Sequence, residues 1–82
     1  MSELGHDLPA LFPAQVDVLR SLKIESEHYR TLASRHHDLA HEIGTIESGA
    51  QPCSDAYLED LKKQRLHLLD EIADMIAERQ AA

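Results

Sequence analysis

The sequence has few of the residues that stabilise small secreted proteins or anchor proteins in membranes. Cys53 is its single cysteine, so no disulfide can form within one chain. A lone thiol favours a reducing compartment, and the first residues show neither the basic start nor the apolar run of a secretory signal. No stretch approaches the roughly 18 apolar residues that a membrane-spanning helix needs. We therefore expect a cytoplasmic protein with no membrane association.

Basic residues and aromatic residues are also scarce. The 82 residues include 15 Asp and Glu against 8 Lys and Arg, which gives a formal net charge of −7 at pH 7. An acidic surface repels phosphate backbones, so nucleic acid is not expected as a partner. Aromatic residues make up 4% of the chain, and a core would have to be built mainly from aliphatic side chains.

Residues 14–47 show the spacing of one long amphipathic helix. Alternating steps of four and three residues connect Val18, Leu22, Glu25, Tyr29, Leu32, His36, Leu39, Ile43 and Ile46. Most of these side chains are apolar or aromatic, and the spacing is that of a coiled-coil seam. Pro13 suits the first turn of such a helix. Residues 1–13 are expected to be irregular.

A second helix is predicted over residues 55–80, after a turn at 48–54. Gly49 can take the left-handed conformation that closes a helix, and Pro52 cannot continue one. Ser54 or Asp55 then supplies the N-cap oxygen. The three-four spacing resumes in Leu58, Leu61, Arg65, Leu68, Ile72, Met75 and Arg79. Residues 81–82 are a tail.

The short turn predicts an all-α fold, an antiparallel two-helix hairpin with coiled-coil-like packing. At 1.5 Å per residue the two helices span roughly 51 and 39 Å, so the first should extend beyond the second. Apolar side chains on that overhang, and on the widened stripe of the second helix, would then lie without a partner in the same chain. We expect them to form the interface of a homodimer or small oligomer, or of a complex with another protein. They are Val18, Leu19, Leu22, Leu66, Leu69 and Ile76.

Several short motifs are characteristic of one family. Residues 61–66 read Leu-Lys-Lys-Gln-Arg-Leu, and Asp-Glu-Ile follows at 70–72. Tyr29, Leu32 and His36 precede them at steps of three and four residues. With these motifs the chain resembles the YdcH-like family of small bacterial proteins, a domain of unknown function, from Phe12 to about Ile72. The resemblance implies a helical hairpin and brings no assigned activity.

Charged side chains on the second helix suggest two kinds of contact. Asp70, Asp74 and Glu78 recur every four residues and form an acidic stripe, which we interpret as a solvated face or a docking face for a basic partner. Arg79 lies opposite Glu25 in the antiparallel register, so we expect these two side chains to pair within the chain.

The histidines raise an alternative function. His37 and His41 lie one turn apart and could bind a divalent metal, but a zinc site needs at least three protein ligands. We therefore expect an exposed pair, with no metal and no cofactor. A further alternative is a ribosome- or nucleic-acid-associated factor, which rests only on Lys62, Lys63 and Arg65 near the turn.

An enzyme is not expected. The chain shows no Ser-His-Asp order, glycine-rich phosphate loop or pair of carboxylates lining a cleft. The leading hypothesis is a small non-enzymatic helical interaction or adaptor protein that self-associates and docks on a protein partner.

Overall fold

The structure, a computed structural model, describes residues 4–81, with side chains from residue 8 onward. Its elements are α1 (Leu4–Leu11), a 3-10 turn η1 (Pro13–Gln15), α2 (Val16–Glu25), α3 (Glu27–Glu47) and α4 (Asp55–Ala81). These elements are all helical, which confirms the predicted all-α class. None of the helices in this part of the chain combines the length and hydropathy that crossing a bilayer requires.

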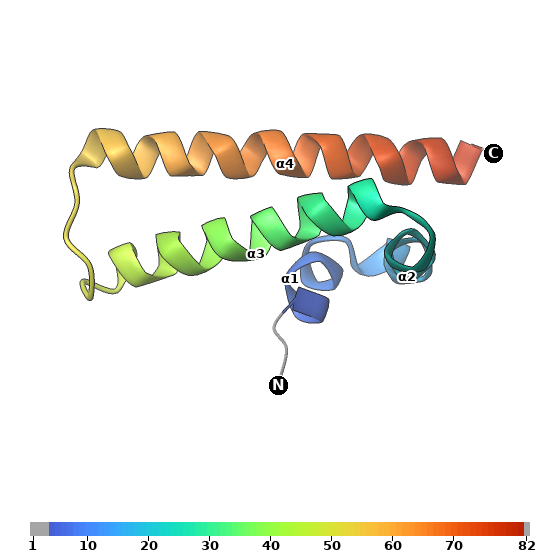
Figure 1. Ribbon diagram of the computed structural model, residues 1–82, viewed down its shortest axis with the longest axis horizontal. Helices are drawn as coiled ribbons and strands as arrows, with labels where there is room; N and C mark the ends of the chain where they lie inside the picture. Colours follow the sequence, from blue (N-terminus) through green and yellow to red (C-terminus); the bar gives the residue numbers. More distant parts are fainter. Residues whose placement is uncertain (1–3, 82) are drawn as a thin grey trace.

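The two long helices, α3 and α4, lie side by side and run in opposite directions (Figure 1). Their facing seams bury apolar side chains at the three-four positions of the sequence, including Leu32, Ile43, Leu61, Leu68 and Ile72. His36 is buried on the same seam. Each buried Leu or Ile stabilises the fold by about 1.5–3 kcal/mol relative to an exposed one. The α3–α4 contact is therefore the main scaffold of the molecule.

The turn between α3 and α4 is built by local hydrogen bonds. Gly49 has a φ of 85°, and the amides of Gly49 and Ala50 donate to the carbonyls of Ile46 (3.0 Å) and Thr45 (3.2 Å). This is the Schellman pattern that ends a helix at a left-handed glycine. Ser54 caps the next helix, because its Oγ accepts from the Tyr57 amide at 3.1 Å. The N-cap is thus Ser54 and not Asp55.

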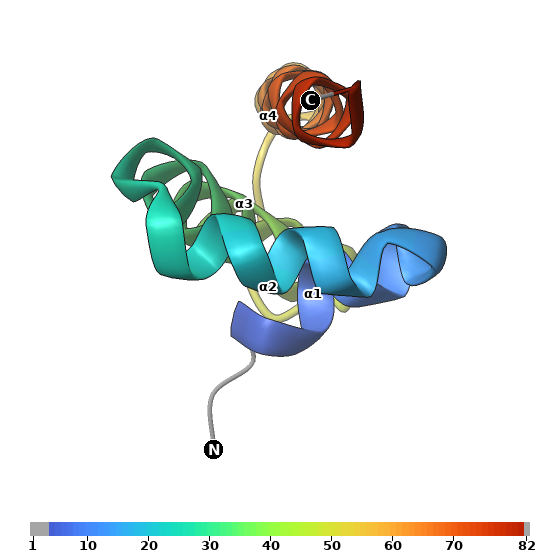
Figure 2. The ribbon, with the colours of Figure 1, turned by 90° about the vertical axis from the view of Figure 1, so that its right-hand side faces the viewer.

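The prediction of one continuous helix over residues 14–47 is wrong, because the chain breaks at Ser26. This residue is extended, with φ −121° and ψ 112°, and its Oγ accepts from the Tyr29 amide at 3.0 Å. It is therefore the N-cap of α3. A straight helix would span roughly 51 Å, more than the 44 Å longest extent of the molecule. No overhang forms; α2 turns back and lies crosswise against α3 and α4 (Figure 2).

The N-terminal segment is also more regular than predicted. Residues 1–13 were expected to be irregular, yet Leu4–Leu11 form α1. Leu8 is 1% exposed and joins the hydrophobic core with Leu19 and Leu22 of α2. Burial of these apolar side chains is the physical reason that α1 and α2 pack on the long helices. Ala81 belongs to α4 and not to a tail, and residues 1–3 and 82 lie outside the described residues.

A polar contact fastens α2 to the end of α4. Arg79 Nη1 donates to Glu25 Oε1 at 2.6 Å and to Ser21 Oγ at 2.8 Å. The predicted pairing of Arg79 with Glu25 is confirmed. Both side chains are partly open to solvent, so the ion pair adds at most about 1 kcal/mol, but it fixes where α2 meets α4.

Candidate functional site

The apolar residues predicted to form an interface are mostly inside the molecule. Leu19, Leu22 and Ile76 are buried in the core, and Val18 and Leu69 are half-buried against it. The expectation that Leu19 and Leu22 lack a partner within the chain is wrong, because the fold-back at Ser26 covers them. Leu66 is the exception: it is 59% exposed on α4.

The acidic stripe of α4 lies at the surface. Asp70, Asp74 and Glu78 are all exposed, and within residues 8–81 none of them forms an ion pair. The neighbouring acid Glu71 approaches His28 of α3, with its Oε2 3.7 Å from the imidazole Nε2. The stripe remains a solvated face in the chain by itself.

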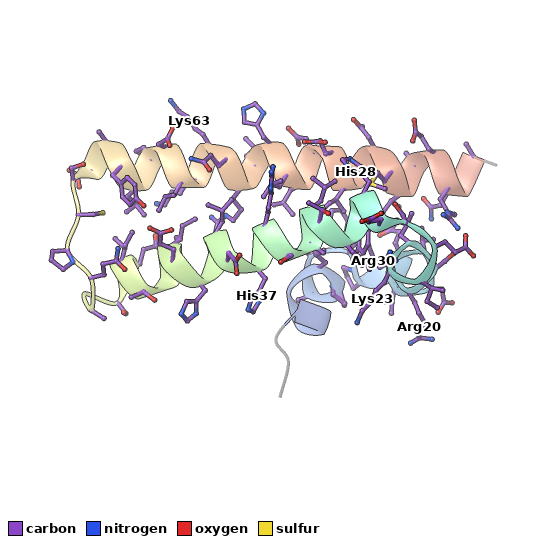
Figure 3. The ribbon with its side chains drawn as sticks, in the orientation of Figure 1. Arg20, Lys23, His28, Arg30, His37 and Lys63 are labelled. Atoms are coloured by element: carbon purple, nitrogen blue, oxygen red, sulfur yellow. The ribbon has the colours of Figure 1, made fainter. Side chains whose placement is uncertain are left out.

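Within the described residues, the histidine pair gains no third metal ligand from the fold. His37 projects from the side of α3 that faces away from α4 (Figure 3), whereas His67 lines a groove between the two long helices. The described part of the chain holds no group of three or more His, Cys, Asp or Glu side chains placed around a common metal position. Metal binding by His37 and His41, the alternative function, is a hypothesis that zinc titration can test.

The basic cluster near the turn is partly neutralised. Lys62 Nζ lies 3.3 Å from Glu47 Oε2, while Lys63 is exposed on the outer side of α4 (Figure 3). The Tyr57 hydroxyl of α4 donates to Glu42 Oε2 of α3 at 2.5 Å, and this hydrogen bond raises the pKa of Tyr57. These contacts tie the ends of α3 and α4 together and neutralise Lys62, one of the three cations of the cluster.

The fold-back of α2 creates a pocket that was not predicted from the sequence. A pocket of about 320 Å³, which we call the N-terminal pocket, opens between α1, α2 and α3. Its lining residues are Pro9, Val16, Leu19, Arg20, Lys23, Tyr29, Arg30, Ala33 and Ser34. Leu19 and Tyr29 are buried and form a fixed apolar floor, and burial raises the pKa of the Tyr29 hydroxyl.

Three cations surround this floor. Arg20 and Lys23 lie one turn apart on α2 and are exposed on the side of the molecule away from α4 (Figure 3). Arg30 Nη1 donates to the carbonyls of Lys23 (2.8 Å) and Ile24 (3.2 Å) at the end of α2. These are helix-terminal carbonyls that have no partner within their own helix, so Arg30 both caps α2 and occupies a defined place beside the pocket.

The pocket is therefore cationic in an acidic protein. Among the residues with placed side chains, 8–81, its lining contains no Asp or Glu. In the part of the chain with placed side chains, no carboxylate forms an ion pair with Arg20 or Lys23. The arrangement offers an apolar contact and positive charge side by side.

The sequence held one signal for this pocket. Arg20 and Lys23, three residues apart, share a helix face. Arg30 lies too far along a straight helix to join them, so the cluster could be found only by recognising the break at Ser26.

Comparison with known proteins places the chain in a family. The model of a family described as "Protein of unknown function (DUF465)" matches residues 30–76. The chain belongs to the DUF465 family. Two relatives are each described as "Uncharacterized protein YdcH", one from Escherichia coli (strain K12) and one from Shigella flexneri. Each is 32% identical over 66 residues, which cover 80% of this chain and 89% of the relative.

These relationships confirm the YdcH-like resemblance and define its extent. The DUF465 match covers most of α3 and α4, the two helices that form the scaffold. No solved structure matches the chain significantly. Membership of DUF465 brings no activity, substrate or partner to this chain.

Proposed function

We propose that this DUF465 protein is a small non-enzymatic interaction protein that docks on a protein partner through the N-terminal pocket. The observation that carries the proposal is the pocket itself, an apolar floor beside cations that have no acidic partner among the described residues. Protein interfaces concentrate their binding free energy in such places, where one or two large side chains enter a pocket and exclude water.

The pocket is small enough to favour a single side chain of a protein partner over a large small-molecule ligand. Its volume of about 320 Å³ lies at the lower end of the roughly 300–1,000 Å³ of small-molecule sites. It can receive a large side chain of a partner, while the rest of the partner contacts α2 and α3 around the rim. The pocket walls come from three helices held together by the core, so little ordering is needed on binding.

A plug variant tests the proposal. Ser34 is exposed at the pocket, and His41 is exposed on the same helix but lines neither pocket nor groove. We expect Ser34→Trp to fill the pocket and abolish binding of partners captured from cells by the tagged full-length chain. His41→Trp, the matched control, should retain them. Partners recovered equally well by the wild type and Ser34→Trp would contradict the proposal, provided that circular dichroism shows both variants folded.

We further propose that the chain self-associates through the outer side of α4, with the α3–α4 hairpin packed as a coiled coil. Leu66, exposed on that helix, supports this part of the proposal. Light scattering coupled to gel filtration at tens of micromolar should give a dimer or small oligomer that Leu66→Gln dissociates. A strict monomer would rule self-association out and would leave the pocket proposal standing.

A further inference from the structure

Resting on the proposed function, we propose that the partner segment bound by the N-terminal pocket is acidic. Its large apolar side chain enters the pocket, and Asp or Glu carboxylates beside that side chain bind Arg20, Lys23 and Arg30. The ligand assigned to the site is thus a peptide in which carboxylates flank an apolar anchor residue.

The distribution of charge is the first argument. The formal net charge is −7, yet among residues 8–81 the pocket lining contains three cations and no acid. Two cations elsewhere, Arg79 and Lys62, form ion pairs with Glu25 and Glu47. The positive charge at the pocket is thus an exception to the acidic surface, and electrostatic complementarity selects partners by such patches.

The geometry of Arg30 is the second argument. Its Nη1 donates to the carbonyls of Lys23 (2.8 Å) and Ile24 (3.2 Å), and these two hydrogen bonds hold the guanidinium in place. A guanidinium that is already positioned loses less side-chain entropy when a carboxylate binds it. Both carbonyl bonds use Nη1, which leaves the N–H groups of Nη2 and Nε as donors for a ligand.

The apolar floor is the third argument, because it excludes simple anions as the natural ligand. Leu19 and Tyr29 are buried, and Val16 and Ala33 are half-buried around them. A free phosphate or sulfate would leave this floor uncovered and in contact with water. A peptide that carries both an apolar side chain and carboxylates covers the floor and pairs the cations at once.

A second copy of the chain is the less suitable source of the acids. Its exposed acidic stripe, Asp70, Asp74 and Glu78, lies on α4, whereas the N-terminal pocket lies among α1, α2 and α3. Docking the stripe of one copy into the pocket of another joins two different surfaces. Such head-to-tail contacts extend into open chains unless their rotation closes a ring.

The test is selection of a random dodecapeptide display library on the immobilised full-length protein, followed by fluorescence anisotropy with the enriched peptides. We expect enrichment of a large apolar residue next to Asp or Glu, in peptides that Ser34→Trp no longer binds. Arg20→Glu or Lys23→Glu should weaken binding by at least about tenfold, and added salt should weaken it as well. Lys63→Glu, which makes the same charge change on the outer side of α4, should alter binding by less than about twofold.

Several outcomes would overturn the inference. One is enrichment of basic or uncharged peptides, and another is binding that Arg20→Glu leaves unchanged. A synthetic peptide of residues 66–80 that outcompetes the selected ones would make a second copy the occupant. If charge reversal has no effect while Ser34→Trp still blocks binding, only the acidic character of the partner is refuted. If no enriched peptide is blocked by Ser34→Trp, the pocket itself is not the docking site and the proposed function fails with it.

Discussion

The substitution Leu22→Ala separates the folded-back chain from the straight helix that its periodicity predicts. Leu22 is 2% exposed in the core of the structure, whereas on an overhanging helix it would face solvent. The change removes three carbon atoms, worth about 2.4 kcal/mol of burial at about 0.8 kcal/mol each, and it leaves a cavity. Comparable Leu→Ala changes in cores cost about 2–5 kcal/mol. A chain of 82 residues has a total stability of roughly 4–12 kcal/mol, so the loss should be severe.

Urea denaturation followed by circular dichroism measures this loss as a change in the free energy of unfolding. Ile24→Ala is the matched control on the same helix, because Ile24 is 73% exposed and its truncation should change stability by less than about 0.5 kcal/mol. The reasoning is refuted if Leu22→Ala costs less than about 1 kcal/mol and cannot be distinguished from the control. That result would mean that α2 does not pack against α3 and α4.

Three further substitutions test single features of the fold by the same denaturation assay. Ser26→Ala removes the N-cap of α3 and should cost about 0.5–2 kcal/mol of stability. In a continuous helix the same change would instead stabilise the protein by a few tenths of a kcal/mol. Gly44→Ala should stabilise by about 0.5–1 kcal/mol, because an added Cβ meets nothing within 4 Å, and a loss would contradict the open surface seen there. Burial raises the pKa of Tyr29, so the unfolded chain loses the Tyr29 hydroxyl proton at a lower pH than the folded chain does. The free energy of unfolding should therefore fall as the pH rises through about 10. The free energy of unfolding of Tyr29→Phe should fall less steeply with pH, and equal slopes for the variant and the wild type would contradict the burial of Tyr29.

The second half of the chain could be predicted because each of its signals is local. Gly49, Pro52 and Ser54 stand together between two apolar repeats, and each has a preferred role at a helix end. The predicted helix over 55–80 corresponds to α4, Asp55–Ala81, whose buried Leu61, Leu68 and Ile72 follow the three-four spacing.

The break at Ser26 could not be predicted from spacing. Leu22, Glu25 and Tyr29 keep the three-four steps across it, and one extended residue hardly disturbs such a pattern. A serine inside a helix is common enough that its capping role becomes visible only once the backbone is known. What decides the break is tertiary: turning α2 back buries Leu19 and Leu22, which a straight helix would leave in water.

The same break decides where function should be sought. The family model covers residues 30–76, which includes most of the α3–α4 scaffold but neither Arg20 nor Lys23. Arg30 lies at the edge of that match and reaches back to the end of α2. The scaffold is thus what this chain shares with the DUF465 model, while most of the positive charge at the pocket comes from the segment outside it. The family model therefore does not point to the partner of the pocket, and Arg20→Glu against Lys63→Glu is the comparison that will show whether the charge selects it.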